Sequence, residues 1–317
     1  MVLGDTPDLP KHSSAKGKIL VIRGGAIGDF ILTLPVFAAL RQQFPDAHLE
    51  VLGYPHIAGL ALAGGLVDRV QAIESRPLAG FFAQNGELSE DWRDYFSEFD
   101  IIVSYLFDPD EIFKTNVLRC AHGQYLAGAH RPDENEPTHA TQVYLKALER
   151  LAIFEANHVP RLAVTSDDRV AGTIAVHPGS GSEKKNWAES NWGALLAQLA
   201  RDTELNFLLI GGEAEGERLT RLSAKLPAAR VEMAQSLPLP ELALQLRRCK
   251  AFVGHDSGIT HLAAALGLPC LVLWPDTNEV IWRPQGQGVR ILRNNSGLAG
   301  LTPQQVANDL EKLLAEV

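Results

Sequence analysis

The chain has 317 residues, a length that suits two domains of ordinary size better than one. Its 46% of hydrophobic and 21% of charged residues exclude a disordered protein, and its net charge of −9 argues against general nucleic-acid binding, which needs a basic surface. The three cysteines are widely spaced and form no CxxC pair, so we expect a reducing compartment and neither a disulfide framework nor a zinc site.

Residues 1–17 are polar and contain no apolar run of the kind that a signal peptide needs. We expect them to form a disordered leader. No stretch of the chain approaches the ~20 apolar residues of a membrane-spanning helix. These features predict a cytoplasmic protein and leave open a peripheral contact with the inner membrane face.

Residues 18–155 are predicted to form the first domain. The apolar run "KILVIRG" predicts a buried strand, because β-branched residues favour strands. A glycine-rich turn, a helical pattern that ends before Pro45 and a second strand, "AHLEVLGYP", follow it. This βαβ order begins a parallel sheet, which two further apolar runs continue before a helix at 139–152 closes the domain.

Residues 156–172 contain a proline and several polar residues, and we expect a linker there. The second domain is predicted over 173–317, where "TIAVHPGSG" restarts the pattern of strand and glycine turn. We leave open that the last helix, from Thr302, packs back on the first domain. The whole order predicts an α/β protein with two doubly wound, Rossmann-like domains that face each other across a cleft, where the carboxyl ends of the strands hold ligands.

The first motif is "RGGAIGDF" at 23–30. Gly25 and Gly28 let the backbone turn sharply after a strand and approach a ligand closely. Asp29 begins the next helix, where it suits either a simple cap or a general base aimed into the cleft. The glycine spacing is not GxGxxG, and no ribose-binding acid follows the second strand, which argues against a dinucleotide site.

The second motif is "HPGSGSEKKNW" at 177–187. A glycine- and serine-rich loop follows a strand and brings Ser180, Lys184 and Lys185 together, and backbone N–H groups, hydroxyls and lysine are what a phosphate needs. The spacing is not that of a Walker A loop. A solvated loop with surface lysines explains the pattern equally well.

The third motif is "HDSGITHLAAAL" at 255–266. Ser257 and Gly258 begin a helix directly after a strand, and the free N–H groups of a helix start suit a diphosphate. A hydrolase triad is excluded on local grounds, because no G-x-S-x-G elbow is present and a histidine one turn along the same helix has the wrong geometry. His261 helps to bind the ligand or only packs, and His255 receives no role.

Two weaker patterns contain acidic residues. "DPD" at 108–110 matches a cation-binding pattern of some sugar-nucleotide enzymes, but Pro109 favours a turn and so short a match arises easily by chance, so we expect no metal site. Glu213 follows a strand and suits a ribose contact, or else a helix start, where Glu complements the helix dipole.

Together these three loops resemble glycosyltransferase family 9, the ADP-heptose:lipopolysaccharide heptosyltransferase family. The resemblance is carried by "IRGGAIGDFILTLPVFAALR", "HPGSGSEKKNW" and "HDSGITHLAAALGLPCLVL", with "WRP" at 282–284 after them. Their order and spacing match the family from about residue 18 to the C-terminus.

The resemblance implies a GT-B fold and an inverting transferase without metal or other cofactor, with the acceptor on the N-terminal side and the nucleotide-sugar donor mainly on the C-terminal side. Asp29 matches the catalytic aspartate of the family, Lys185 a lysine on the donor phosphates, and Asp256 an aspartate on the transferred sugar. The implied donor is ADP-heptose, and the implied acceptor is a lipopolysaccharide-type glycolipid or another cell-envelope glycan. The donor-binding residues expected on these grounds are Ser180, Lys185, Glu213, Asp256, Ser257, Gly258 and His261.

The chain also departs from the family pattern. "WPDT" at 274–277 stands where Gly-Pro-Thr is common, and the segment 75–135, which would recognise the acceptor, matches least. The "WPDT" loop motivates a second hypothesis, a non-catalytic nucleotide-sugar-binding protein of an envelope-assembly complex. Retention of Asp29 and Lys185 argues against it, and the missing GxGxxG argues against a nicotinamide-dependent dehydrogenase.

Overall fold

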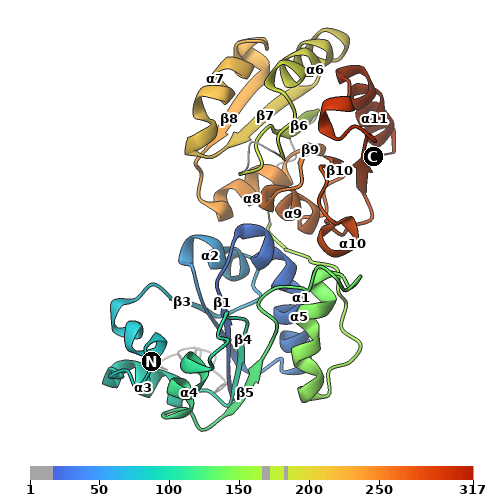
Figure 1. Cartoon of the computed structure of the whole chain (residues 1–317). Helices are drawn as coiled ribbons and strands as arrows, with labels where there is room; N and C mark the ends of the chain where they lie inside the picture. Colours follow the sequence, from blue (N-terminus) through green and yellow to red (C-terminus); the bar gives the residue numbers. More distant parts are fainter. Residues whose placement is uncertain (1–16, 166–171, 182–184, 317) are drawn as a thin grey trace, which may run out of the picture.

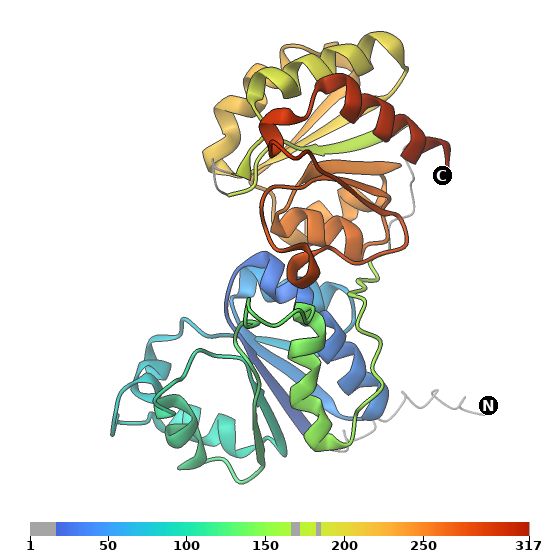
Figure 2. The same ribbon diagram turned by 45° about the vertical axis from the view of Figure 1, so that its right-hand side comes forward.

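The computed structural model describes residues 17–165, 172–181 and 185–316. The first 16 residues of the predicted leader, residues 166–171 of the predicted linker and Lys184 lie outside this part of the chain. Two α/β halves, each built on its own sheet, stand one above the other in Figures 1 and 2. The predicted fold class is therefore confirmed.

The first sheet has the strand order β3-β2-β1-β4-β5, and every pair in it is parallel. Its strands are β1 (Lys18–Arg23), β2 (His48–Gly53), β3 (Arg69–Ala72), β4 (Ile101–Ser104) and β5 (Gln124–Ala127). β1 is central because its apolar residues alternate between two cores: Ile19 and Val21 face one, and Leu20 and Ile22 face the other.

Helices cover both faces of this sheet (Figure 1). They are α1 (Ile27–Gln43), α2 (Pro55–Ala63), η1 (Arg76–Phe82), α3 (Glu90–Ser97), α4 (Ile112–Leu118), α5 (Ala140–Leu145) and η2 (Lys146–Leu151). Residues of η1, α3 and α4 form one core with Leu20 and Ile22, whereas those of α1, α2 and α5 pack with Ile19 and Val21 on the other face. Each face of the sheet is thereby shielded from water, as a parallel sheet requires.

The second sheet has the order β11-β10-β9-β6-β7-β8, again all parallel. Its strands are β6 (Thr173–His177), β7 (Asn206–Gly211), β8 (Val231–Gln235), β9 (Ala251–His255), β10 (Cys270–Leu273) and β11 (Val289–Leu292). Its helices are α6 (Glu189–Asp202), η4 (Glu213–Glu215), α7 (Gly216–Ser223), η5 (Ala228–Arg230), α8 (Leu239–Arg247), α9 (Gly258–Ala265), α10 (Glu279–Trp282), η6 (Leu298–Gly300) and α11 (Pro303–Ala315).

The last helix belongs to the second half. Val306 and Leu310 of α11 lie in one hydrophobic core with Trp192 of α6 and Leu271 of β10. The alternative that this helix returns to the first domain is therefore wrong, because its apolar side is used against α6 (Figure 1).

The two halves meet along an apolar seam. Figures 1 and 2 both show α1 and α2 against α8 and α9, and one hydrophobic core contains residues from both sheets. Two hydrogen bonds also cross the seam: His139 Nε2 contacts the Arg283 carbonyl at 2.8 Å, and Leu162 N–H donates to the Ala265 carbonyl at 2.9 Å. No helix in the described part of the chain is long and apolar enough to cross a membrane.

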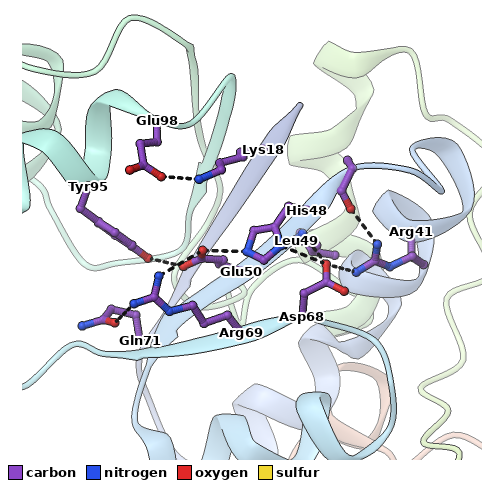
Figure 3. Close-up of polar contacts among 11 residues, drawn as sticks. Lys18, Arg41, His48, Leu49, Glu50, Asp68, Arg69, Gln71, Tyr95 and Glu98 are labelled. Atoms are coloured by element: carbon purple, nitrogen blue, oxygen red, sulfur yellow. Dashed lines mark hydrogen bonds and ion pairs between the residues drawn. The ribbon is translucent and has the colours of Figure 1, made fainter. Parts of the chain in front are cut away.

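The amino ends of β1 and β2 carry a polar network that lies apart from the seam (Figure 3). The buried carboxylate of Glu50 accepts from the Tyr95 hydroxyl at 3.1 Å and lies 2.8 Å from His48 Nε2 and 3.6 Å from an Arg69 nitrogen. Burial, with the Glu50 charge beside it, raises the pKa of Tyr95, which therefore stays a neutral donor. The network joins β2 to α3 and β3.

Candidate active site

A cavity of about 1410 Å³ opens between the two halves, at the carboxyl ends of β1, β9 and β10. Parallel α/β sheets place ligands at this edge, because loops and helix starts converge there. All the predicted site residues except Glu213 line it, and they come from both halves: Gly25, Gly28, Asp29, Ser180, Lys185, Asp256, Ser257, Gly258 and His261.

Asp29 occupies the third position of α1, where it acts as a cap and also reaches the cavity. Its Oδ2 accepts from the N–H of Ala26 at 3.3 Å, so it caps the start of the helix, while a third of its side chain stays exposed on the cavity wall. Gly25 has a φ of +99°, and a Cβ there would stand 3.2 Å from Asp29 Oδ2. Glycine is therefore needed beside the carboxylate.

Arg23 is a site residue that sequence reasoning missed. It is buried at the end of β1 and donates to the His130 carbonyl at 2.9 Å and the Asp29 carbonyl at 3.2 Å, with its guanidinium stacked 4.4 Å from the Tyr144 ring. Its charge stands 3.9 Å from Asp29 Oδ1. The available signal was an arginine at the end of an otherwise apolar strand, because a buried arginine needs fixed partners.

Lys185 and Asp256 form an ion pair on the opposite wall. The Lys185 ammonium donates to Asp256 Oδ2 at 3.1 Å. The Lys185 side chain is 41% exposed, whereas that of Asp256 is only 8% exposed. The nearly buried carboxylate thus holds its cation at the cavity surface. Because an ammonium has three donors, Lys185 can keep Asp256 and contact an anion at the same time.

Ser257 caps α9 at the cavity. Its Oγ accepts from the Thr260 N–H at 3.3 Å and lies 3.3 Å from His177 Nδ1. The first N–H groups of α9 have no partner within the helix and carry its positive dipole end. The predicted helix start after β9 is therefore present and opens on the cavity.

Gly28 and Gly258 bring the starts of α1 and α9 into contact across the seam. A Cβ on Gly258 would stand 2.7 Å from Ile27 Cβ and 2.9 Å from the Gly28 nitrogen, closer than real Cβ contacts. A Cβ on Gly28 would meet His261 at an ordinary 3.5 Å. Only one of these two glycines is required by the packing.

The pair Gly258→Ala and Gly28→Ala tests this difference. Gly258→Ala must push the two helices apart, so we expect a loss of about 1–3 kcal/mol of unfolding free energy, as for other overpacked cores. Gly28→Ala should leave stability unchanged or raise it, because alanine is the better helix former. Thermal unfolding of both variants measures the contrast, and equal melting temperatures would contradict the packing argument.

Three histidines of the second half are buried: His177 in β6, His255 in β9 and His261 in α9. Burial lowers the pKa of His177 to about 3 and the pKa values of His255 and His261 to about 4. They are therefore neutral at pH 7. His261 lines the cavity against Gly28 and reaches a ligand only as a neutral hydrogen-bonding group.

The acidic residues of the two weaker patterns, Glu213 and Asp108, do not line the cavity. Glu213 is exposed in η4 and is not on the cavity wall, and Glu215 instead accepts from the Gly212 N–H at 2.9 Å. Asp108 accepts from the N–H groups of Phe113 and Lys114 at the start of α4. Among residues 17–165, 172–181 and 185–316, no cluster of three or more histidine, cysteine or acidic side chains is placed to hold a metal ion.

Two facing parallel sheets with a ligand-sized cleft between their carboxyl edges define a GT-B fold. A family 9 glycosyltransferase from Veillonella parvula has this fold, with a TM-score of 0.78 and 19% identity over 96% of this chain and 99% of that one. An Escherichia coli heptosyltransferase solved with ADP has the same fold, with a TM-score of 0.75 and 20% identity over 93% of this chain and 99% of that one. The model of glycosyltransferase family 9 (heptosyltransferase) matches residues 132–312, and the chain belongs to this family.

Curated relatives agree with this assignment. The chain is 30% identical over 325 residues to lipopolysaccharide heptosyltransferase 1 of Escherichia coli (strain K12), covering 93% of this chain and 100% of that protein. It is 21% identical over 334 residues to lipopolysaccharide heptosyltransferase 3 of the same strain, covering 91% and 96%. The predicted family and the predicted enzyme class, a glycosyltransferase, are thus confirmed.

Proposed function

We propose that this glycosyltransferase moves heptose from ADP-heptose to a lipopolysaccharide-type or other cell-envelope glycan acceptor, with inversion at the anomeric carbon. One observation carries the proposal: Asp29 of the first half shares a cavity with Lys185, Asp256 and the start of α9 of the second. Structures of Escherichia coli heptosyltransferase with ADP and with a fluorinated ADP-heptose support the choice of donor.

Asp29 is assigned as the general base. An acceptor hydroxyl is a weak nucleophile at neutral pH, so a carboxylate that takes its proton as the bond forms lowers the barrier. The hydroxyl oxygen attacks the anomeric carbon from the face opposite the phosphate, the bond to the phosphate oxygen breaks, and the nucleoside diphosphate leaves with the electron pair. Attack from the opposite face inverts the configuration.

The second half supplies the leaving-group site. Negative charge grows on the diphosphate as the bond breaks, and Lys185, the Ser257 hydroxyl and the first N–H groups of α9 are the donors we assign to it, while Ser180 lines the same site. Lys185 contacts Oδ2 of Asp256, so Oδ1 is the atom we assign to a hydroxyl of the transferred sugar. Glu213 is left without a supported role, and its ribose contact stays a prediction.

Lys185→Ala tests the phosphate site. Loss of a charge-assisted contact worth roughly 1.5–3 kcal/mol should weaken ADP binding by about 10- to 100-fold, measured by calorimetry. Lys312→Ala is the matched control, because Lys312 pairs with Asp309 on α11 outside the cavity. Unchanged ADP affinity in Lys185→Ala would refute the phosphate role.

The part of the cavity wall that we assign to the acceptor comes from the first half and contains exposed aromatic side chains. Phe82 and Phe107 are 47% and 71% exposed on its wall, and the Phe107 ring lies 4.7 Å from the ring of His130. Exposed aromatic faces and an adjacent Arg131 suit the mixed apolar and polar surface of a glycan. Peripheral contact with the inner membrane face, a cytoplasmic location and independence of metal stay predictions.

A binding screen separates this proposal from its alternatives. ADP-heptose, UDP-sugars and NAD are compared by thermal shift, and the largest shift is expected with ADP-heptose. Release of ADP in the presence of a cell-envelope acceptor extract then distinguishes transfer from binding alone. A non-catalytic binding protein would give the shift without the release.

A further inference from the structure

His255 ends β9, directly before Asp256, and is fully buried. Both of its ring nitrogens have backbone partners: Nε2 lies 2.8 Å from the Trp187 nitrogen, and Nδ1 lies 3.3 Å from the Gly179 carbonyl oxygen. A backbone N–H only donates, so Nε2 must be the unprotonated nitrogen. Nδ1 therefore carries the hydrogen and donates it to Gly179.

The two partners of His255 stand on either side of the residues that the second motif contributes to the cavity. Ser180, Lys185 and Asn186 line the cavity between Gly179 and Trp187. The Ser180 hydroxyl donates to the Asn186 side chain at 2.8 Å, which joins the two ends of this segment. One imidazole thus holds the backbone before and after Lys185.

Trp187 is itself fixed in the core. Its indole N–H donates to the Leu301 carbonyl at 3.0 Å, and its ring packs edge-on against Trp192, 5.2 Å between centroids. The Trp192 ring in turn meets the His255 ring edge-on at 5.4 Å. The anchor below Lys185 is therefore rigid, and rigid anchors are what hold a charged group at a required position.

We infer that His255 is a positioning residue for the donor site, which sets the place where Lys185 meets Asp256 and the diphosphate. The inference rests on the proposed function and extends it, because sequence reasoning gave His255 no role. His255 is also the last residue of β9, directly before Asp256. It therefore fixes the positions of both members of the ion pair, Lys185 and Asp256. Distortion here should weaken binding of the donor and leave the acceptor unaffected.

The charges facing the ring are consistent with a neutral imidazole. Burial, together with the nearby Arg218, lowers the pKa of His255 to about 4, against the opposing effects of the Gly179 carbonyl and Asp256. His177 also lies close enough to interact with His255, and burial keeps it neutral as well. Protonation of Nε2 would set a donor against the Trp187 N–H and break this anchor.

His255→Leu and His255→Gln form the test pair. Leucine leaves the buried Trp187 N–H and Gly179 carbonyl without partners, whereas the glutamine amide restores one acceptor and one donor. We expect His255→Leu to raise the Kd for ADP and the KM for the donor at least 10-fold, with the acceptor KM unchanged. His255→Gln should return both donor constants to within about threefold of the wild type. Equal donor constants in the two variants would overturn the inference.

A double-variant cycle with Lys185→Ala shows whether His255 acts through Lys185. We expect His255→Leu to cost at least 10-fold in ADP affinity in the wild type and less than about twofold in Lys185→Ala. The same cost in both backgrounds would refute the positioning role. If Lys185→Ala alone left ADP affinity unchanged, the phosphate site of the proposed function would fail instead.

His255→Asn keeps the test decisive should His255→Leu not fold. The shorter amide reaches only one of the two partners, so ADP affinity should fall between that of His255→Gln and that of Lys185→Ala. Identical affinities in His255→Asn and His255→Gln would contradict the inference. Far-ultraviolet circular dichroism confirms that each variant is folded before it is measured.

Discussion

Replacing Asp29 by asparagine should lower kcat for sugar transfer by about 10²- to 10⁴-fold, the usual contribution of a general base, and leave ADP affinity within about twofold. Asparagine is preferred to alanine because its amide oxygen still accepts from the Ala26 N–H, so the cap of α1 is kept. Initial rates at saturating donor and acceptor measure kcat, and calorimetry measures ADP affinity. Asp29→Ala should lose transfer activity as well, with an added loss of helix stability.

Thr302→Ala is the control for a lost cap. Thr302 accepts from the Gln305 N–H at the start of α11 and does not line the cavity, so this variant should lose stability without losing kcat. An unchanged kcat in Asp29→Asn would sink the base assignment. If kcat and ADP affinity fell together, Asp29 would instead act only as a structural cap.

The protein should lose stability steeply as the pH falls below about 6.5. The pKa of His177 is lowered to about 3 and the pKa values of His255 and His261 to about 4, so the unfolded chain, with ordinary values near 6.5, binds more protons. Their contribution is complete above 6.5 and is lost progressively toward pH 4. Each adds up to about 1.4 kcal/mol per pH unit, so acidification from pH 7 to 5 should cost several kcal/mol.

Urea unfolding at pH 7, 6 and 5 measures this slope. In His255→Gln one of the three titrating groups is removed. Unfolding should then take up about one proton fewer, and the slope of the unfolding free energy against pH should become smaller by that amount. The lowered pKa of Asp68 acts in a separate window, because its contribution is complete above about 3.8 and is lost only below that pH. A constant free energy of unfolding between pH 7 and 5 would contradict the neutral, buried state of these histidines.

The inner strands were predictable from sequence, and three of the four edge strands were not. β1, β6 and β9 are almost continuously apolar because both of their faces are covered, and a buried strand of this kind stands out. β5, β8 and β11 lie at sheet edges, and each is only four or five residues long with polar or charged residues among the apolar ones, so none forms a continuous apolar run.

Some residues of the site could likewise be predicted from the sequence, and others could not. Glycine turns and helix starts at strand ends are local features, and together with the resemblance to family 9 they allowed Asp29, Lys185 and Ser257 to be assigned to the cavity from the sequence. Arg23 and His255 take their roles from partners 107 and 76 residues away in sequence. Long-range pairing of this kind leaves no mark on the local pattern.

The apolar core shared by the two halves makes them one thermodynamic unit. The core runs from Val21 and Leu34 of the first half to Leu262 and Val272 of the second without a polar boundary. An isolated fragment 18–155 would expose the sides of α1 and α2 that now pack on α8 and α9, so we expect it to aggregate rather than fold alone. Heat should accordingly melt the full chain in a single transition, and a ligand bound at either wall should stabilise both halves together.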